Sequence, residues 1–73
     1  MAEEKVDSPI PGKIIRVNVK AGSEVKEGDK ICDIESMKME NPILAPVSGV
    51  VKEVGVTPDQ FVKTGQLIAI IDY

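Results

Sequence analysis

The residue best placed to do chemistry is Lys38, which lies between Met37 and Met39 in the run "KICDIESMKMENPILA". A lysine amine offers a positive charge or, once deprotonated, a nucleophile. Both flanks of this run resemble strands, so the bend falls on Met37-Lys38. A two-residue hairpin turn normally takes Asn-Gly or Asp-Gly, and Met-Lys there stores about 1–3 kcal/mol of backbone strain. Such strain is kept where a residue is presented to another molecule, so the pattern predicts a hairpin that displays Lys38.

Other reactive side chains are scarce in the sequence. Glu35 and Glu40 flank the bend and would orient or solubilise it, and no other residue completes an acid–base site with them. The single cysteine, Cys32, has no histidine to activate it, so we expect a buried, inert thiol and no transition-metal site. Gly28 is followed by Asp29, which excludes a phosphate-binding loop. We therefore expect that the chain is not an enzyme by itself.

Length and composition limit the chain to one small, ordered domain. It has 73 residues, of which 42% are hydrophobic and 29% charged. A net charge of −3 and only two aromatic residues argue against nucleic-acid binding. The longest apolar run, residues 67–71, is too short to cross a bilayer. A single cysteine suits a reducing compartment, so we expect a cytoplasmic protein. We also expect a monomer in isolation, since no large apolar surface patch can be inferred from the sequence.

The sequence contains an internal repeat. Residues 8–36 align with residues 45–73 without a gap, at an offset of 37 residues. The identical pairs are Pro9/Pro46, Gly12/Gly49, Val17/Val54, Val19/Val56, Val25/Val62, Lys26/Lys63, Gly28/Gly65, Ile31/Ile68 and Ile34/Ile71. Agreement of prolines, glycines and apolar residues together indicates a duplicated unit.

Each copy of the repeat has the pattern of short strands. An alternating run at residues 12–19 or 49–56 is followed by a turn and a β-branched run at 30–35 or 67–72. The glycines at 12, 28, 49 and 65 are expected to be turn residues, and no helical period is present. Neither copy can bury its apolar face alone, so the two should pack face to face. The predicted fold is all-β: a flattened β-sandwich, or barrel-sandwich hybrid, of two small antiparallel sheets with pseudo-two-fold symmetry.

Two segments fall outside the repeat. Residues 37–44 join the copies, and the symmetry predicts a protruding hairpin there, at the end of the sandwich opposite to both termini. Residues 1–7 are expected to be an N-terminal tail or linker, disordered in part or adding a short edge segment. The domain is then residues 8–73.

The run "ESMKMENPI" resembles the attachment motif of biotinyl (biotin carboxyl carrier) domains, in which a lysine between two methionines carries biotin. The resemblance covers residues 8–73, including the repeat and the run "APVSGVV" after the motif. Ser36 stands where this family of biotin/lipoyl attachment domains usually has alanine. The gap-free repeat leaves no room for the extra "thumb" loop of some carriers, so the chain is similar to the thumbless type.

This resemblance implies that biotin is joined to Lys38 through an amide bond. There it would act as a swinging arm, moving a carboxyl group between biotin carboxylase and carboxyltransferase active sites. Biotin protein ligase would recognise Met37 and Met39, which are also expected to cover the base of the hairpin. Glu35, Ser36 and Glu40 would form the part of the hairpin that surrounds the attachment residues. The chain would be a non-catalytic carrier subunit or domain of a biotin-dependent carboxylase, decarboxylase or transcarboxylase.

Two other functional classes stay open at the level of sequence. A lipoyl domain shares the fold, the repeat and a hairpin lysine, but lipoyl hairpins usually contain Asp-Lys-Ala, which neither neighbour of Lys38 matches. An unmodified interaction module would use Lys38 as a surface charge, and Asn-Gly at the bend would favour it. The two methionines argue against both alternatives.

Overall fold

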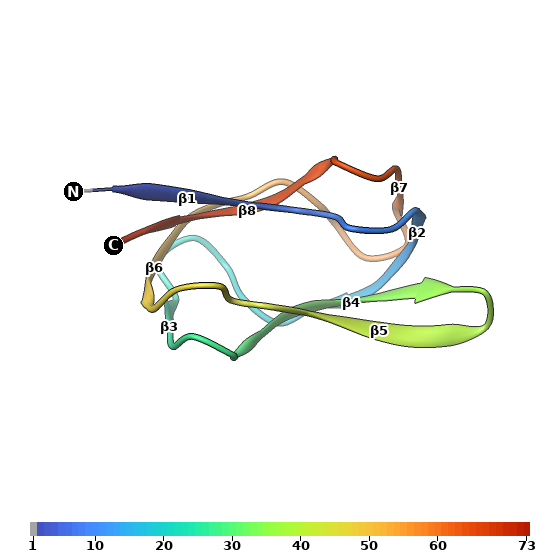
Figure 1. Cartoon of the computed structure of the whole chain (residues 1–73), viewed down its shortest axis with the longest axis horizontal. Helices are drawn as coiled ribbons and strands as arrows, with labels where there is room; N and C mark the ends of the chain where they lie inside the picture. Colours follow the sequence, from blue (N-terminus) through green and yellow to red (C-terminus); the bar gives the residue numbers. More distant parts are fainter. Residues whose placement is uncertain (1) are drawn as a thin grey trace.

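The computed structural model describes residues 2–73, which form eight strands and no helix (Figure 1). The first four strands are β1 Glu3–Asp7, β2 Gly12–Val17, β3 Glu24–Val25 and β4 Lys30–Ser36. The second four are β5 Met39–Leu44, β6 Gly49–Val54, β7 Phe61–Val62 and β8 Leu67–Asp72. The all-β class is confirmed. Residues 2–73 contain no helix that is long and apolar enough to cross a membrane.

The strands form two four-stranded sheets, in the orders β1-β8-β6-β3 and β5-β4-β2-β7. Every pairing is antiparallel, and the two sheets face one another as the layers of a flattened sandwich (Figure 1). The copies of the repeat do more than pack face to face. The short strand of each copy, β3 or β7, crosses over and pairs with the sheet of the other copy. The two copies are therefore interlocked.

Strand β1 is the short edge segment that was one of the two possibilities expected for residues 1–7, and it extends the domain to before residue 8. Residues 3–7 pair with β8 at the edge of one sheet, and Val6 is buried. At the repeat offset β1 corresponds to β5, which pairs with β4 in the same way, and Val6 corresponds to the buried Ile43. The two strands share almost no residue identity. The structural repeat therefore begins earlier than an alignment of residue identities indicates.

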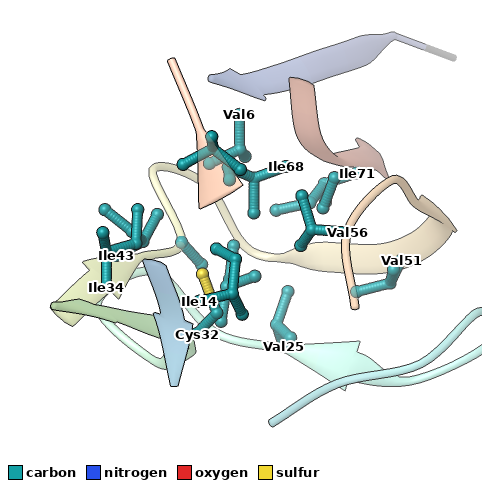
Figure 2. Close-up of a cluster of buried hydrophobic side chains, with 14 residues drawn as sticks. Val6, Ile14, Val25, Cys32, Ile34, Ile43, Val51, Val56, Ile68 and Ile71 are labelled. Carbon is teal, nitrogen blue, oxygen red and sulfur yellow. The ribbon is translucent and has the colours of Figure 1, made fainter. Parts of the chain in front are cut away.

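The core lies between the sheets and is aliphatic (Figure 2). The central strands β4 and β8 each bury four consecutive residues, and their pairings contain register shifts, so burial does not follow a strict period of two. Repeat-related positions contribute from opposite sheets. The buried apolar residues are Val6, Ile14, Val25, Ile31, Cys32, Ile34, Ile43, Ala45, Val51, Val56, Val62, Ile68, Ala69 and Ile71.

Two of the four glycines expected in turns have another role. Gly28 and Gly65 have φ of +93° and +88° and do lie in turns. Gly12 and Gly49 instead begin β2 and β6, where a Cβ atom would collide with a backbone carbonyl oxygen of the neighbouring strand. Close strand approach, rather than a turn, requires glycine at these two positions.

The hairpin and the termini lie at opposite ends of an elongated molecule, as predicted (Figure 1). The molecule measures 37 Å along its long axis and 18 by 16 Å across it. Ala2 and Tyr73 exchange two backbone hydrogen bonds, of 2.8 and 2.9 Å. The repeat offset maps this pair onto Met39 and Ser36, which close the hairpin. The termini thus occupy the pseudo-symmetric counterpart of the turn.

Candidate cofactor-attachment site

The turn between β4 and β5 consists of Met37 and Lys38 alone. Strand β4 ends at Ser36 and β5 begins at Met39, and these two residues are paired. Met37 has φ of 54° and Lys38 has φ of 63°, which are the left-handed values of a type I′ turn. The predicted position of the bend and its backbone strain are confirmed.

The choice of residues in this turn is exceptional within the protein. Among residues 2–73, the other left-handed positions are Gly22, Gly28, Gly65 and Asp59. Glycine has no steric penalty there, and aspartate tolerates the conformation through local hydrogen bonding. Met37 has neither property. The turn therefore keeps two unfavourable residues, at about 1–3 kcal/mol each, where the rest of the chain avoids them.

The side chains at the tip are open to solvent. Met37 is 91% exposed and Met39 is 66% exposed, and Lys38 is also exposed. Lys38 takes part in none of the ion pairs between residues 2 and 73. The expectation that both methionines cover the hairpin base is wrong for Met37, because its side chain packs against almost nothing. The tip presents one amine between two exposed thioethers.

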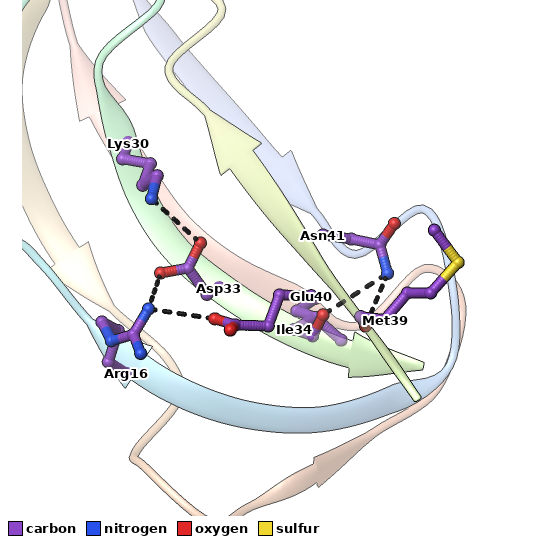
Figure 3. Close-up of polar contacts among 7 residues, drawn as sticks. All are labelled: Arg16, Lys30, Asp33, Ile34, Met39, Glu40 and Asn41. Carbon is purple, nitrogen blue, oxygen red and sulfur yellow. Dashed lines mark hydrogen bonds and ion pairs between the residues drawn. The ribbon is translucent and has the colours of Figure 1, made fainter. Parts of the chain in front are cut away.

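The base of the hairpin is fixed by a charged cluster (Figure 3). The Arg16 guanidinium on β2 donates to the Asp33 carboxylate at 2.7 Å and to the Glu40 carboxylate at 3.1 Å. Lys30 lies 3.6 Å from Asp33, whose side chain is only 3% exposed. The bonds to Asp33 and Glu40 raise the pKa of Arg16. This cluster connects three neighbouring strands of one sheet.

Asn41 adds a second connection across the hairpin. Its side-chain amide donates to the carbonyl oxygen of Met39 at 3.2 Å and to that of Ile34 at 3.5 Å (Figure 3). Glu35 and Glu40 are directly opposed, an unfavourable like-charge pair that the contact of Glu40 with Arg16 offsets. The predicted context residues therefore do meet, and the exposed tip stands on a firmly held base.

Several residues of this site were missed from sequence. Arg16 and Asn41 carry no motif of their own. Asp33 could have been noticed, because the second copy has Ile70 at this position and a carboxylate in an apolar strand needs a partner.

An exposed aromatic side chain beside the hairpin was missed too. Phe61 is 76% exposed. It borders a shallow hollow that also reaches Lys38, and we call this the Phe61 hollow. Its lining consists of Pro11, Gly12, Lys13, Glu35, Ser36, Met37, Lys38 and Phe61.

Cys32 lies on the core side of β4 and is fully buried. Burial, with a smaller contribution from the Asp33 charge, raises the pKa of its thiol to about 11. A thiol with such a pKa is almost entirely protonated at neutral pH and is a poor nucleophile. Cys32 therefore belongs to the core, as the sequence predicted, and not to the hairpin site.

The hairpin residues fit a cofactor that is covalently attached. Joining an acyl group to a protein needs an accessible amine on a segment that a second protein can hold. Lys38 supplies the amine, and the exposed turn supplies the segment. Such a lysine needs no deep pocket around it, because the covalent bond replaces binding affinity.

Comparison with known proteins agrees with this arrangement. Residues 4–71 match the family described as "Biotin-requiring enzyme". The chain is 41% identical over 71 residues to the "Biotinylated protein TB7.3 homolog" of Mycobacterium leprae (strain TN), covering 97% of this chain and 99% of that protein. It is 37% identical over 68 residues to mitochondrial pyruvate carboxylase of Homo sapiens, covering 93% of this chain and 6% of the carboxylase.

The fold has close counterparts among solved structures. Urea carboxylase of Kluyveromyces lactis superposes with a TM-score of 0.91 at 29% identity, over 99% of this chain and 6% of that one. The chain thus spans only about 6% of the length of these carboxylases. The family match covers nearly the whole chain and includes the hairpin. The chain therefore belongs to the biotin-requiring family of biotin/lipoyl attachment domains, with biotin as its cofactor.

Proposed function

We propose that this chain is a biotin carboxyl carrier domain in which biotin is joined to Nζ of Lys38. The observation that carries the proposal is the strained tip: Met37 and Lys38 both hold positive φ where the rest of the chain uses glycine or aspartate. Presentation of Lys38 to other proteins explains why this strain is retained. The similarity to biotinylated and carboxylase proteins supports biotin as the group presented.

Lys38 performs the attachment step. Its deprotonated amine attacks the activated carboxyl carbon of biotin, a C–N bond forms, the activating group leaves and the amine loses a proton. Arginine could not replace lysine, because it keeps its charge and does not form this amide. We expect a biotin protein ligase to supply the activated biotin and to contact the exposed Met37 and Met39.

The rest of the chain positions the modified lysine. The charged cluster and Asn41 hold the hairpin base beneath the exposed side chain of Lys38. The termini lie at the far end of a 37 Å molecule, so a connection to a larger protein leaves the tip clear. Tethering makes each encounter with an active site intramolecular and raises the effective concentration.

Biotin, when bound, supplies a site that accepts a carboxyl group and gives it up again. The partners that fit this role are a biotin carboxylase and a carboxyltransferase. The similarity to pyruvate carboxylase supports them. The chain itself would catalyse neither transfer.

A carboxyl-transfer assay tests this proposal. The biotinylated chain is incubated with a biotin carboxylase, ATP and radiolabelled bicarbonate, and label retained on the chain is counted. We expect label on the biotinylated chain and none on the Lys38→Arg variant. A biotinylated chain that acquires no label from any of several biotin carboxylases would overturn the carrier role.

A further inference from the structure

We propose that the Phe61 hollow is a resting site for the ring system of the biotin carried by Lys38. The inference rests on the proposed attachment and goes beyond it, by assigning an occupant to a surface that attachment does not need. The lysine that carries the group is itself part of the lining of the hollow. The occupant is therefore the group tethered at its rim.

The outer face of the sheet carries a graded row of side chains at this end of the molecule. Glu35 on β4 is paired with Lys13 on β2, and Lys13 is paired with Phe61 on β7. Directly paired residues place their side chains on the same face, about 5 Å apart. The row therefore presents a carboxylate, an ammonium group and an aromatic ring in that order.

The three kinds of side chain complement the chemistry of biotin. Its sulfur-containing ring is apolar and suits the exposed face of Phe61, since sulfur and aromatic rings attract one another. Its ureido ring has a carbonyl oxygen that accepts a hydrogen bond and two N–H groups that donate. Lys13 can donate to the carbonyl oxygen, and Glu35 can accept from an N–H group. Lys13 is free to turn toward the hollow, because its pairing with the exposed Asp59 is loose, at 3.6 Å.

The reach of the arm allows this contact. Glu35 lies three residues before Lys38 along the hairpin, a span of about 10 Å in extended chain. Lys38 and Phe61 line the same hollow, so the lysine side chain and the biotin chain have only to cross this hollow to bring the sulfur-containing ring to Phe61. A tethered group has an effective concentration of the order of millimolar, so weak complementarity is enough to populate the site. Because the biotin ring is bound only weakly in the hollow, a partner enzyme can compete for it.

The internal repeat shows that the fold does not require an aromatic residue at the position of Phe61. The corresponding strand β3, at the end with the termini, has Glu24 at this position, paired with Val50. The fold therefore accepts a charged residue in this two-residue strand and does not need an aromatic one. Phe61 keeps 76% of its surface in solvent, and Met37, which is 91% exposed, lines the same hollow, so Phe61 belongs to an exposed apolar group and is not a single scattered side chain. It lies at the end of the molecule that carries Lys38.

Nuclear magnetic resonance of the full chain, isotope-labelled and measured before and after biotinylation, tests the proposal. Intact mass first establishes that each sample carries one biotin. We expect amide shift changes at Lys13 and Phe61, and nuclear Overhauser contacts between the Phe61 ring and the biotin ring. In Phe61→Thr both signals should be lost, while Phe61→Leu should keep the shift change at Lys13.

Leu44→Thr is the matched control, since Leu44 is 48% exposed on the same sheet at the far end of β5. It should keep all biotin contacts. Shift changes confined to residues 37–39 in a fully biotinylated sample would overturn the resting site while leaving attachment intact. Slower biotinylation of Phe61→Thr without any effect on the biotinylated spectrum would also overturn it, and would make the hollow a ligase contact. If no sample gains biotin, the mass shows that attachment itself fails.

Discussion

At the scale of single residues, the site depends on a contrast between Lys38 and the side chains around it. Lys38 is exposed and unpaired among residues 2–73, whereas the thiol of Cys32 is enclosed by the core. Burial, not residue type, separates the two groups. Lys20, Lys26 and Lys63 are also exposed and form no ion pair among the described residues, so the strained hairpin tip, and not exposure alone, distinguishes Lys38.

Cys32 gives a prediction about pH and stability. Burial raises its thiol pKa from 9.0 to about 11, so the folded state holds this proton more tightly than the unfolded state. Stability should therefore fall as pH rises from 9 toward 11. In Cys32→Ala, which copies Ala69 of the second repeat, this part of the fall should disappear. Urea titrations of both proteins across that pH range measure it.

Thiol titration checks the same residue independently. A disulfide reagent at pH 8 should label Cys32 slowly in the folded protein and rapidly in urea. Equal rates in the two states would show that Cys32 is accessible and would remove the basis of the pH prediction.

Single residues also show which parts of the site can be predicted from sequence. Lys38 and its methionines were predictable because an unfavourable turn stands out against ordinary turn chemistry. Arg16 and Phe61 were not, because their roles depend on strand register. Arg16 acts on Asp33 and Glu40, which lie on two other strands, and Phe61 acquires its neighbours only when β7 joins the sheet of the other copy.

At the scale of elements, the hairpin combines a strained tip with a well-satisfied base. The strain gives a prediction. Met37→Asn should raise the free energy of unfolding by about 1 kcal/mol, because asparagine tolerates φ of 54° better than methionine. The matched substitution Met39→Asn, at a strand position, should give no such gain. Urea denaturation measures both.

The same pair of variants separates stability from recognition. If Met37 is part of the recognised surface, Met37→Asn should be biotinylated more slowly although it is more stable. A Met37→Asn protein that is less stable than the parent would contradict the strain argument.

The charged cluster at the hairpin base gives a second element-scale prediction. Arg16→Met should lower stability by about 3 kcal/mol, because it leaves the buried Asp33 carboxylate with only Lys30 at 3.6 Å. Asp33→Val should lower it much less, because Arg16 is half exposed and can turn to water. The double variant should resemble Asp33→Val. Thermal or urea unfolding of the three proteins completes the cycle, and equal, additive losses would contradict the assigned roles.

At the scale of the whole molecule, the pseudo-two-fold symmetry explains why the hairpin and the termini lie at opposite ends. Strand β1 pairs with β8 as β5 pairs with β4, so the N-terminal segment belongs to the repeat. The sequence predicted the symmetry and the sandwich from glycines and apolar positions. It allowed a short edge segment at residues 1–7 but did not assign it to the repeat, because β1 and β5 share the buried positions of Val6 and Ile43 and little residue identity.

Deletion of residues 1–7 tests the role of β1. The variant loses the burial of Val6 and the hydrogen bonds that β1 makes to β8, so its stability should fall by about 2–4 kcal/mol. Lys5→Ala, an exposed change in the same strand, should cost about 0.5 kcal/mol or less. A shortened chain as stable as the parent would show that β1 is dispensable.

The central claim is that this fold presents Lys38 for attachment of one biotin. The most direct measurement is the intact mass of the purified chain after incubation with a biotin protein ligase, biotin and ATP, followed by peptide mapping. The account predicts a single gain equal to biotin minus one water, mapped to Lys38, and no gain in the folded Lys38→Arg variant. Biotin found on another lysine, or a folded chain that is modified only by a lipoate ligase, would contradict it.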